Sequence, residues 1–139
     1  GVESIAGALG ALTKLTRLDL SKNYVSDEGS QSLARVLGAC PALAQLRLSN
    51  NHIGDDGATS LAGVLGQCSA LELLDLSYNS IGAEGVGRLA GMLQACTAVS
   101  RLELGCNEMG ADGMGRLAAV LGRCDALRRL GLRDNGIGA

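Results

Sequence analysis

The segment LTRLDLSKNYV, residues 15–25, decides the fold, because its pattern occurs five times in the chain. The framework positions Leu15, Leu18, Leu20, Asn23 and Val25 return every 28 residues without an insertion or deletion. The spacing of two between the last leucines places them on one face of a strand, and the asparagine marks a turn. The later copies are LAQLRLSNNHI (43–53), LELLDLSYNSI (71–81), VSRLELGCNEM (99–109) and LRRLGLRDNGI (127–137).

A helical pattern follows each predicted strand. In EGSQSLARVLGAC, residues 28–40, apolar side chains recur at helical spacing and form one stripe. Residues 1–12 match the helix of a preceding repeat, so we expect five strands that alternate with five helices. The expected units are a partial repeat at 1–14, repeats at 15–42, 43–70, 71–98 and 99–126, and a partial repeat at 127–139. Together they predict a single domain, which we expect to be a fragment of a longer array with neighbouring repeats at both ends.

Stacking identical units bends the chain. Neighbouring parallel strands lie about 4.8 Å apart, whereas packed helices need about 8–10 Å. The helical side therefore opens and the strand side closes. We predict a right-handed α/β solenoid with the form of a horseshoe arc, with one parallel β-sheet on the concave face and α-helices on the convex face.

Composition argues against several classes of partner. The chain has 139 residues, 47% of them apolar, and a formal charge of −2, so its charge favours neither nucleic acid nor an acidic membrane surface. The chain has no Phe or Trp, and its only tyrosines are Tyr24 and Tyr78. Nucleic-acid bases would therefore find few aromatic side chains to stack on. No apolar run approaches the length of about 18 residues that a membrane span needs. We therefore expect no nucleic acid and no membrane insertion.

The pattern LxxLxLxxNxI, followed by a short acidic turn with glycine and then Leu-Ala-x-x-Leu on a helix, resembles the leucine-rich repeats of the ribonuclease-inhibitor type. Similar repeats occur in NOD-like receptors and in Ran GTPase-activating proteins. The resemblance covers essentially the whole chain. It implies the solenoid fold and indicates much less about function.

The loop LRLSNNHIGDDG, residues 46–57, has the oxygen-rich composition of a metal site. The other repeats argue against this interpretation, because the positions of Asn50 and His52 vary freely between repeats. The recurring asparagine instead predicts a structural ladder that satisfies the backbone groups of the turns. The ladder is Asn23, Asn51, Asn79, Asn107 and Asn135. We expect the recurring acids Glu28, Asp56, Glu84 and Asp112 to cap the helices that they begin, so no metal is required.

Four cysteines recur at one helical position. Stacked helices would hold these thiols in a row spaced by about 8–10 Å, which is too far apart for one zinc ion or a disulfide. We predict reduced, buried core thiols, from which we expect an intracellular, cytoplasmic setting. Cys106 occupies a variable position, where we expect it to be exposed, and its reactivity stays open. The four cysteines in the row are Cys40, Cys68, Cys96 and Cys124.

Residues for catalysis are scarce. His52 is the only histidine, and the sequence contains no GxSxG, Walker or HExxH motif. We expect neither an enzyme nor a cofactor.

Residues that vary between repeats, on a constant framework, predict where function lies. Side chains that alternate with the core leucines should face outward from the strands and form the concave face. We predict that a partner protein contacts this face, centred on Leu73, Tyr78, Arg101 and Arg129. An exposed Leu73 beside Tyr78 is expected to give the middle of the arc a small apolar anchor. The alternative is that its arginines and acids only pair with neighbouring strands. The predicted binding set is Arg17, Asp19, Lys22, Gln45, Arg47, Asn50, Leu73, Asp75, Tyr78, Arg101, Glu103, Cys106, Arg129, Arg133 and Asp134.

Several functions are compatible with such a face. The leading hypothesis is a protein–protein interaction module, and the second is a structural spacer or scaffold segment in a larger assembly. The resemblance also implies two further possibilities, a regulator of a GTPase and a sensor segment of a NOD-like receptor.

Overall fold

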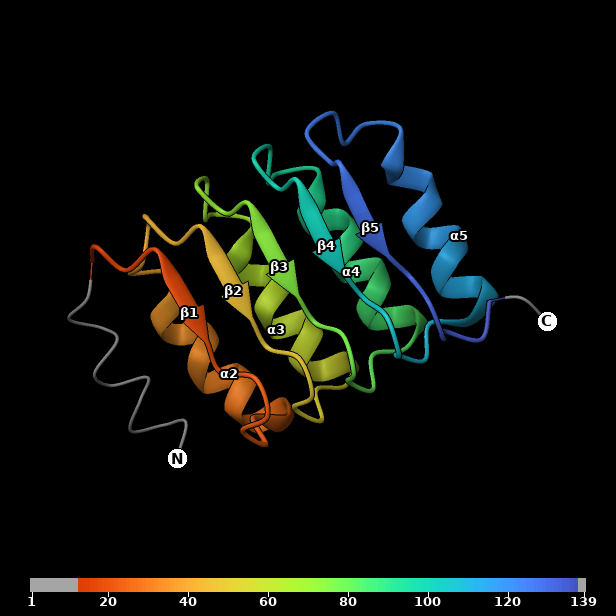
Figure 1. The fold of residues 1–139 in the computed structure, drawn as a ribbon, viewed down its shortest axis with the longest axis horizontal. Coiled ribbons are helices and arrows are strands. Elements are labelled where there is room, and N and C mark those ends of the chain that lie inside the picture. Colours follow the sequence, from red (N-terminus) through yellow and green to blue (C-terminus); the bar gives the residue numbers. More distant parts are fainter. Residues whose placement is uncertain (1–12, 138–139) are drawn as a thin grey trace.

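The computed structural model describes residues 13–137, and the predicted helix within residues 1–12 lies outside that range. The described chain alternates strand and helix throughout (Figure 1). Its strands are β1 (Arg17–Asp19), β2 (Gln45–Arg47), β3 (Leu73–Asp75), β4 (Arg101–Glu103) and β5 (Arg129–Gly131). Its helices are α2 (Ser26–Leu37), α3 (Asp55–Leu65), α4 (Ala83–Leu93) and α5 (Gly110–Leu121).

The five strands form one parallel sheet in the order β1-β2-β3-β4-β5. Each strand pairs with the next at an offset of one repeat, so that Leu18, Leu46 and Leu74 are successive Cα partners. The helices all lie behind the sheet, and its other face is left uncovered by them (Figure 1). The predicted α/β solenoid with one parallel sheet is therefore confirmed.

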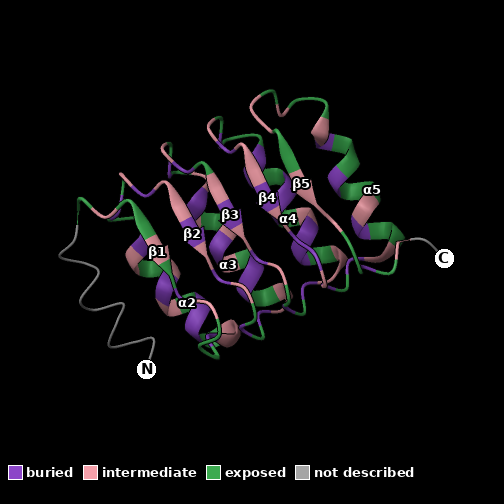
Figure 2. Cartoon of the chain, viewed as in Figure 1, coloured by how far each residue is buried: buried purple, intermediate pink, exposed green. Residues whose placement is uncertain are grey.

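The core lies between the sheet and the helices. Leu46, Leu74 and Leu102 point into it from the strands and are fully buried. Leu61 and Leu89 meet them from α3 and α4 and are also fully buried. Burial is most continuous in the central repeats, while α5 and the last loop are largely exposed (Figure 2). This gradient follows from repeat stacking, because a unit at the end of the described array has a neighbour on one side only. Along residues 13–137, no helix has the length and apolar character needed to cross a membrane.

The recurring asparagines join successive repeats through their side chains. The Asn79 Oδ1 accepts hydrogen bonds from the backbone N–H groups of Asn51 (3.0 Å) and Ile53 (2.9 Å) in the preceding repeat. Its Nδ2 donates to the carbonyl oxygens of Leu48 and Leu76, both at 3.0 Å. An amide can serve both roles at once because it carries a donor and an acceptor. The same link to a carbonyl of the preceding repeat is made by Asn51 to Leu20, Asn107 to Leu76 and Asn135 to Leu104.

Two aspartates cap the helix of the following repeat. The Asp27 Oδ1 accepts hydrogen bonds from the N–H groups of Gly54 (2.7 Å) and Gly57 (2.9 Å), at the start of α3. Asp55 makes the same pair of bonds with the start of α4. A Cβ at Gly57 would lie 2.6 Å from the Asp27 Oδ1, so glycine is needed for this close approach. The caps therefore also hold neighbouring repeats together.

The prediction that each helix is capped by its own recurring acid is wrong. These acids lie in the first helical turn, as expected, where a negative charge interacts favourably with the helix dipole. Among the described residues, however, none of their carboxylates accepts a backbone hydrogen bond at the start of its own helix. Their side chains are exposed, while the N–H groups at the starts of α3 and α4 already donate to Asp27 and Asp55 of the preceding repeats. The four acids are Glu28, Asp56, Glu84 and Asp112.

The aspartate caps coincide with one conformation of the loop before each helix. Gly54 and Gly82, whose N–H groups bind an aspartate, have φ values of −107° and −97°. One repeat later the capping position holds Ala83, and there Gly110 has a φ of +62°. Its N–H donates instead to the carbonyl oxygen of Asn135 at 2.8 Å. The N–H group thus finds a partner in both cases, and the backbone conformation differs with that partner.

Candidate protein-binding face

The strands present outward side chains in two rows on the face that the helices leave uncovered (Figure 1). Because neighbouring strands are in register, the members of a row are Cα partners. These side chains alternate with the core leucines along each strand. The first row is Arg17, Gln45, Leu73, Arg101 and Arg129. The second row is Asp19, Arg47, Asp75, Glu103 and Gly131.

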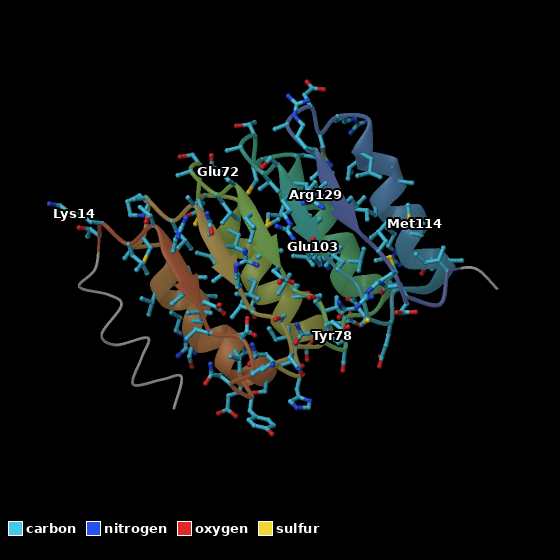
Figure 3. All side chains as sticks on the ribbon, in the orientation of Figure 1. Lys14, Glu72, Tyr78, Glu103, Met114 and Arg129 are labelled. Carbon is cyan, nitrogen blue, oxygen red and sulfur yellow. The ribbon has the colours of Figure 1, made fainter. Side chains whose placement is uncertain are left out.

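A third row lies in the loops that follow the strands. Figure 3 shows Arg129 and Glu103 in front of the sheet and Tyr78 at its lower edge, beyond the strand ends. Every member of the third row has a positive φ, between 54° and 61°, so this left-handed turn is part of the repeat. Arg133 lies beside this row. The third row is Lys22, Asn50, Tyr78, Cys106 and Asp134.

The two aspartates of the second row turn toward the loops. The Asp75 Oδ1 accepts hydrogen bonds from the Ser77 backbone N–H (3.0 Å) and hydroxyl (2.6 Å). The Asp19 Oδ1 accepts one from the Ser21 N–H at 3.0 Å. The hydroxyl and the backbone N–H of Ser21 hold the pKa of Asp19 below its ordinary value, since both favour the charged carboxylate. These carboxylates are therefore partly satisfied within their own strand and turn.

Ion pairs on this face are few. Arg47 Nη1 lies 3.7 Å from an Asp75 oxygen across two strands, and Arg101 Nε lies 3.0 Å from Glu103 Oε2 within one strand. The sequence analysis left open that these residues only pair with neighbouring strands. Of the two ion pairs, the one between Arg47 and Asp75 joins neighbouring strands, whereas the one between Arg101 and Glu103 lies within β4. In the part of the chain that the structure describes, Arg17 makes no ion pair. Partly exposed pairs of this kind contribute only about 0–1 kcal/mol each.

Leu73 lines a hollow on β1 to β4, which we call the Leu73 hollow. Its volume is 640 Å³. Leu73 is half-buried there, whereas we expected it to be exposed, because longer side chains surround it. The lining residues are Arg17, Leu18, Asp19, Gln45, Arg47, Leu73 and Arg101.

A second hollow of 340 Å³, the Tyr78 hollow, lies toward the loops of the last repeats. Arg133 reaches across the loop that follows β4 and donates a hydrogen bond from Nη2 to the Tyr78 hydroxyl. Its guanidinium carbon lies 5.8 Å from the centre of the Tyr78 ring. Gly105 permits this crossing, because a Cβ there would lie 3.3 Å from the Arg133 Cγ. Leu73 lines only the first hollow and Tyr78 only the second. The expectation that the two form one apolar anchor is therefore wrong, since Tyr78 lies beyond the end of β3.

A pair of stacked rings was missed by the sequence analysis. Tyr24 and His52 lie with ring centroids 5.3 Å apart and an interplanar angle of 11°. Tyr24 is 80% exposed, and both rings flank a small hollow of 230 Å³ with Lys22 and Asn50. The two residues occupy the same position in successive repeats, 28 residues apart, and this spacing could have predicted the contact.

The recurring cysteines are unpaired, and three of the four are buried. Cys124 is only half-buried, which corrects our expectation, because it lies in the last described helical unit. Cys106 is also half-buried rather than exposed, with its Sγ 3.6 Å from an Asp134 oxygen. Burial raises the pKa of the Cys96 thiol to about 11. Within residues 13–137, no three His, Cys, Asp or Glu side chains form a group that could hold a metal ion.

Comparisons with known proteins agree with this architecture. The family model described as Leucine Rich repeat matches residues 11–34, 39–62, 67–90 and 95–118, more than half of the chain. No curated protein matches the sequence. Two solved structures are similar in fold. They are the tropomodulin C-terminal domain of Caenorhabditis elegans (20% identity, TM-score 0.82, covering 94% of this chain and 81% of that one) and the leiomodin-1 actin-binding site 2 (17% identity, TM-score 0.80, covering 94% and 76%). The chain therefore belongs to the leucine-rich repeat family.

Proposed function

We propose that the chain is a protein-interaction module that binds a partner protein across the concave face, defined here as the three outward rows and Arg133. The observation that carries this proposal is the contrast between a constant framework and a variable face. Core leucines and asparagines recur in register, while the outward positions carry arginines, acids, Leu73 and Tyr78. Arginine and tyrosine are enriched among residues that dominate binding energy, and Tyr78 is 49% exposed.

The convex side offers fewer anchors. Gly63, Gly91 and Gly115 lie on the outer side of their helices, where a Cβ would meet no atom within 4 Å. Small residues of this kind contribute little contact area.

The type of repeat and the setting are part of the proposal. The 28-residue unit with helices of 11 or 12 residues supports the ribonuclease-inhibitor type. The similar leiomodin-1 structure is named as an actin-binding site, which supports a protein as the class of partner. Free cysteines at core positions suit a reducing, intracellular compartment. Buried thiols with raised pKa values are poor nucleophiles, which supports binding without catalysis.

The test is a quantitative capture experiment. The immobilised wild-type chain and the double variant Tyr78→Ala, Arg101→Glu are exposed to the same cell extract, and bound proteins are measured by mass spectrometry. We expect the variant to lose a specific partner by about 2 kcal/mol or more, while its melting temperature stays unchanged.

A control variant reverses charge on the helices. The double variant Arg88→Glu, Arg116→Glu alters two exposed arginines on α4 and α5. It should retain the partner. A partner that is lost only from this control would place the binding surface on the convex side. If the captured partner is a GTPase, its rate of GTP hydrolysis with and without the chain separates a binding module from a regulator.

A further inference from the structure

Charge is segregated along the strands of the concave face. The first row contains Arg17, Arg101 and Arg129 and no acid, while the acids of the strands all lie in the second row. Leu73 and Gln45 lie between Arg17 and Arg101. The first row is therefore a line of cations interrupted by an apolar and a neutral side chain.

Among the described residues, the acids nearby make one ion pair with this row, between Glu103 and Arg101. Asp19 and Asp75 are already hydrogen-bonded to the serines two positions further along. Glu103 engages only the Nε of Arg101, so the Nη groups of that guanidinium retain their donors. Within residues 13–137, Arg17 has no ion-pair partner. Donors for an incoming anion thus remain on both sides of Leu73.

The Leu73 hollow combines these features. Three arginines and one aspartate line it, together with the half-buried Leu73. A ligand that fills it must offer an apolar group in the middle and negative charge on the flanks.

We propose that the Leu73 hollow binds an acidic peptide segment of the partner, in which an apolar side chain rests on Leu73 between carboxylates bound by Arg17 and Arg101. This inference rests on the proposed function and names the chemistry of the partner at that face. Guanidinium groups suit this role because they donate to carboxylates in a forked geometry.

Strand spacing determines the peptide pattern. Arg101 lies one strand from Leu73 and Arg17 lies two strands from it, so the distances across the sheet are about 4.8 Å and about 9.6 Å. In an extended peptide, side chains on one face are about 6.7 Å apart. The long arginine side chains accommodate the remaining differences of about 2–3 Å. The matching pattern is Glu-x-Leu-x-Glu.

A carboxylate-bearing protein fits this face better than a nucleic acid. A phosphate backbone carries a continuous line of charge, which would bring it against Asp19 and Asp75 beside the arginines. Separate carboxylates can meet the arginines individually. The hollow also lacks an aromatic side chain for base stacking.

The test titrates the ¹⁵N-labelled chain with synthetic peptides that contain Glu-Ser-Leu-Ser-Glu in a Gly-Ser background. We expect chemical-shift changes at the backbone amides of Gln45, Leu73 and Arg101, with affinity in the micromolar to millimolar range. A peptide with Gln in place of both Glu residues should bind at least about fivefold more weakly. A peptide with Ala in place of Leu should also bind more weakly.

Matched protein variants locate the site. Arg17→Glu should weaken the Glu peptide by about fivefold or more, whereas Arg88→Glu on α4, with the same change in net charge, should leave binding within about twofold. Equal weakening by both variants, equal binding of the Gln peptide, or no shifts at millimolar peptide would overturn the inference. Tighter binding of a ten-nucleotide oligothymidylate at the same amides would also overturn it, in favour of a phosphate-binding strip.

The two proposals fail in different ways. If the Glu peptide does not bind while capture of the partner still depends on Tyr78 and Arg101, the concave face binds by another chemistry. If capture is insensitive to those residues, the proposed function itself fails.

Discussion

Replacing Asn79 with alanine tests whether the asparagine ladder stabilises the stacked repeats. The Asn79 Oδ1 is the acceptor for the N–H groups of Asn51 and Ile53, and both of those residues are fully buried. The substitution removes the acceptor and leaves two buried donors without it. An unsatisfied buried neutral group costs about 1–3 kcal/mol, so we expect Asn79→Ala to lower the free energy of unfolding by at least about 2 kcal/mol.

The assay is urea denaturation followed by circular dichroism, with the slope of the transition compared between variants. An unchanged slope with a lower midpoint indicates a loss of stability of the same cooperative unit. His52→Ala provides a first comparison, because this exposed side chain in the neighbouring loop should change stability by less than about 0.5 kcal/mol.

Asn23→Ala is the closer control. Asn23 occupies the same repeat position but is exposed, and among the described residues its side chain donates only to the nearby carbonyls of Leu20 and Ser21. Its backbone N–H bond to the Asn51 Oδ1 is kept in the variant. We expect this variant to lose about 1 kcal/mol or less. Equal losses from Asn79→Ala and Asn23→Ala would refute the reasoning, because they would show that the links between repeats contribute nothing beyond local turn bonds.

Three further predictions concern the helix caps and the thiols. Asp55→Ala should lower the free energy of unfolding by about 1 kcal/mol in urea denaturation, whereas Asp56→Ala, which removes an exposed carboxylate from the same turn, should have a smaller effect; the reverse order would contradict the cap across repeats. Ala83→Asp should stabilise the chain by about 0.5–1 kcal/mol by capping α5, and an unchanged or lower melting temperature would show that the Asp55 geometry does not transfer to the next repeat. In native protein at pH 8, Cys106 should react with iodoacetamide before Cys96, whose thiol stays protonated because burial raises its pKa to about 11. Mass spectrometry of the modified peptides measures this order, and equal rates would mean that the core opens easily.

Local chemistry made the architecture predictable. A strand needs alternation with a period of two and a helix needs a stripe with a period of 3.6, and both can be recognised in a single repeat. Five copies in phase then leave one way to bury every leucine stripe, which is to stack the units. The outward rows could be derived for the same reason, because alternation assigns Arg101 to the face as surely as it assigns Leu102 to the core.

The contacts between repeats were less predictable, because they depend on residues that are distant in sequence. Asp27 carries no local sign that its partner is the helix that begins near Gly54. Arg133 meets Tyr78 across the loop after β4, where Gly105 leaves room for the arginine side chain.

The sequence by itself determined the solenoid, the positions of its strands, and which side chains leave the core, because periodicity is a property of neighbouring residues. The tertiary structure decided which of those side chains meet. It separated Leu73 from Tyr78, placed Arg17, Arg47 and Arg101 around Leu73, and directed Asp19 and Asp75 toward their own turns. Those outcomes depend on strand spacing, side-chain rotamers and competition among hydrogen-bond partners, and such quantities are set only once the repeats are packed together.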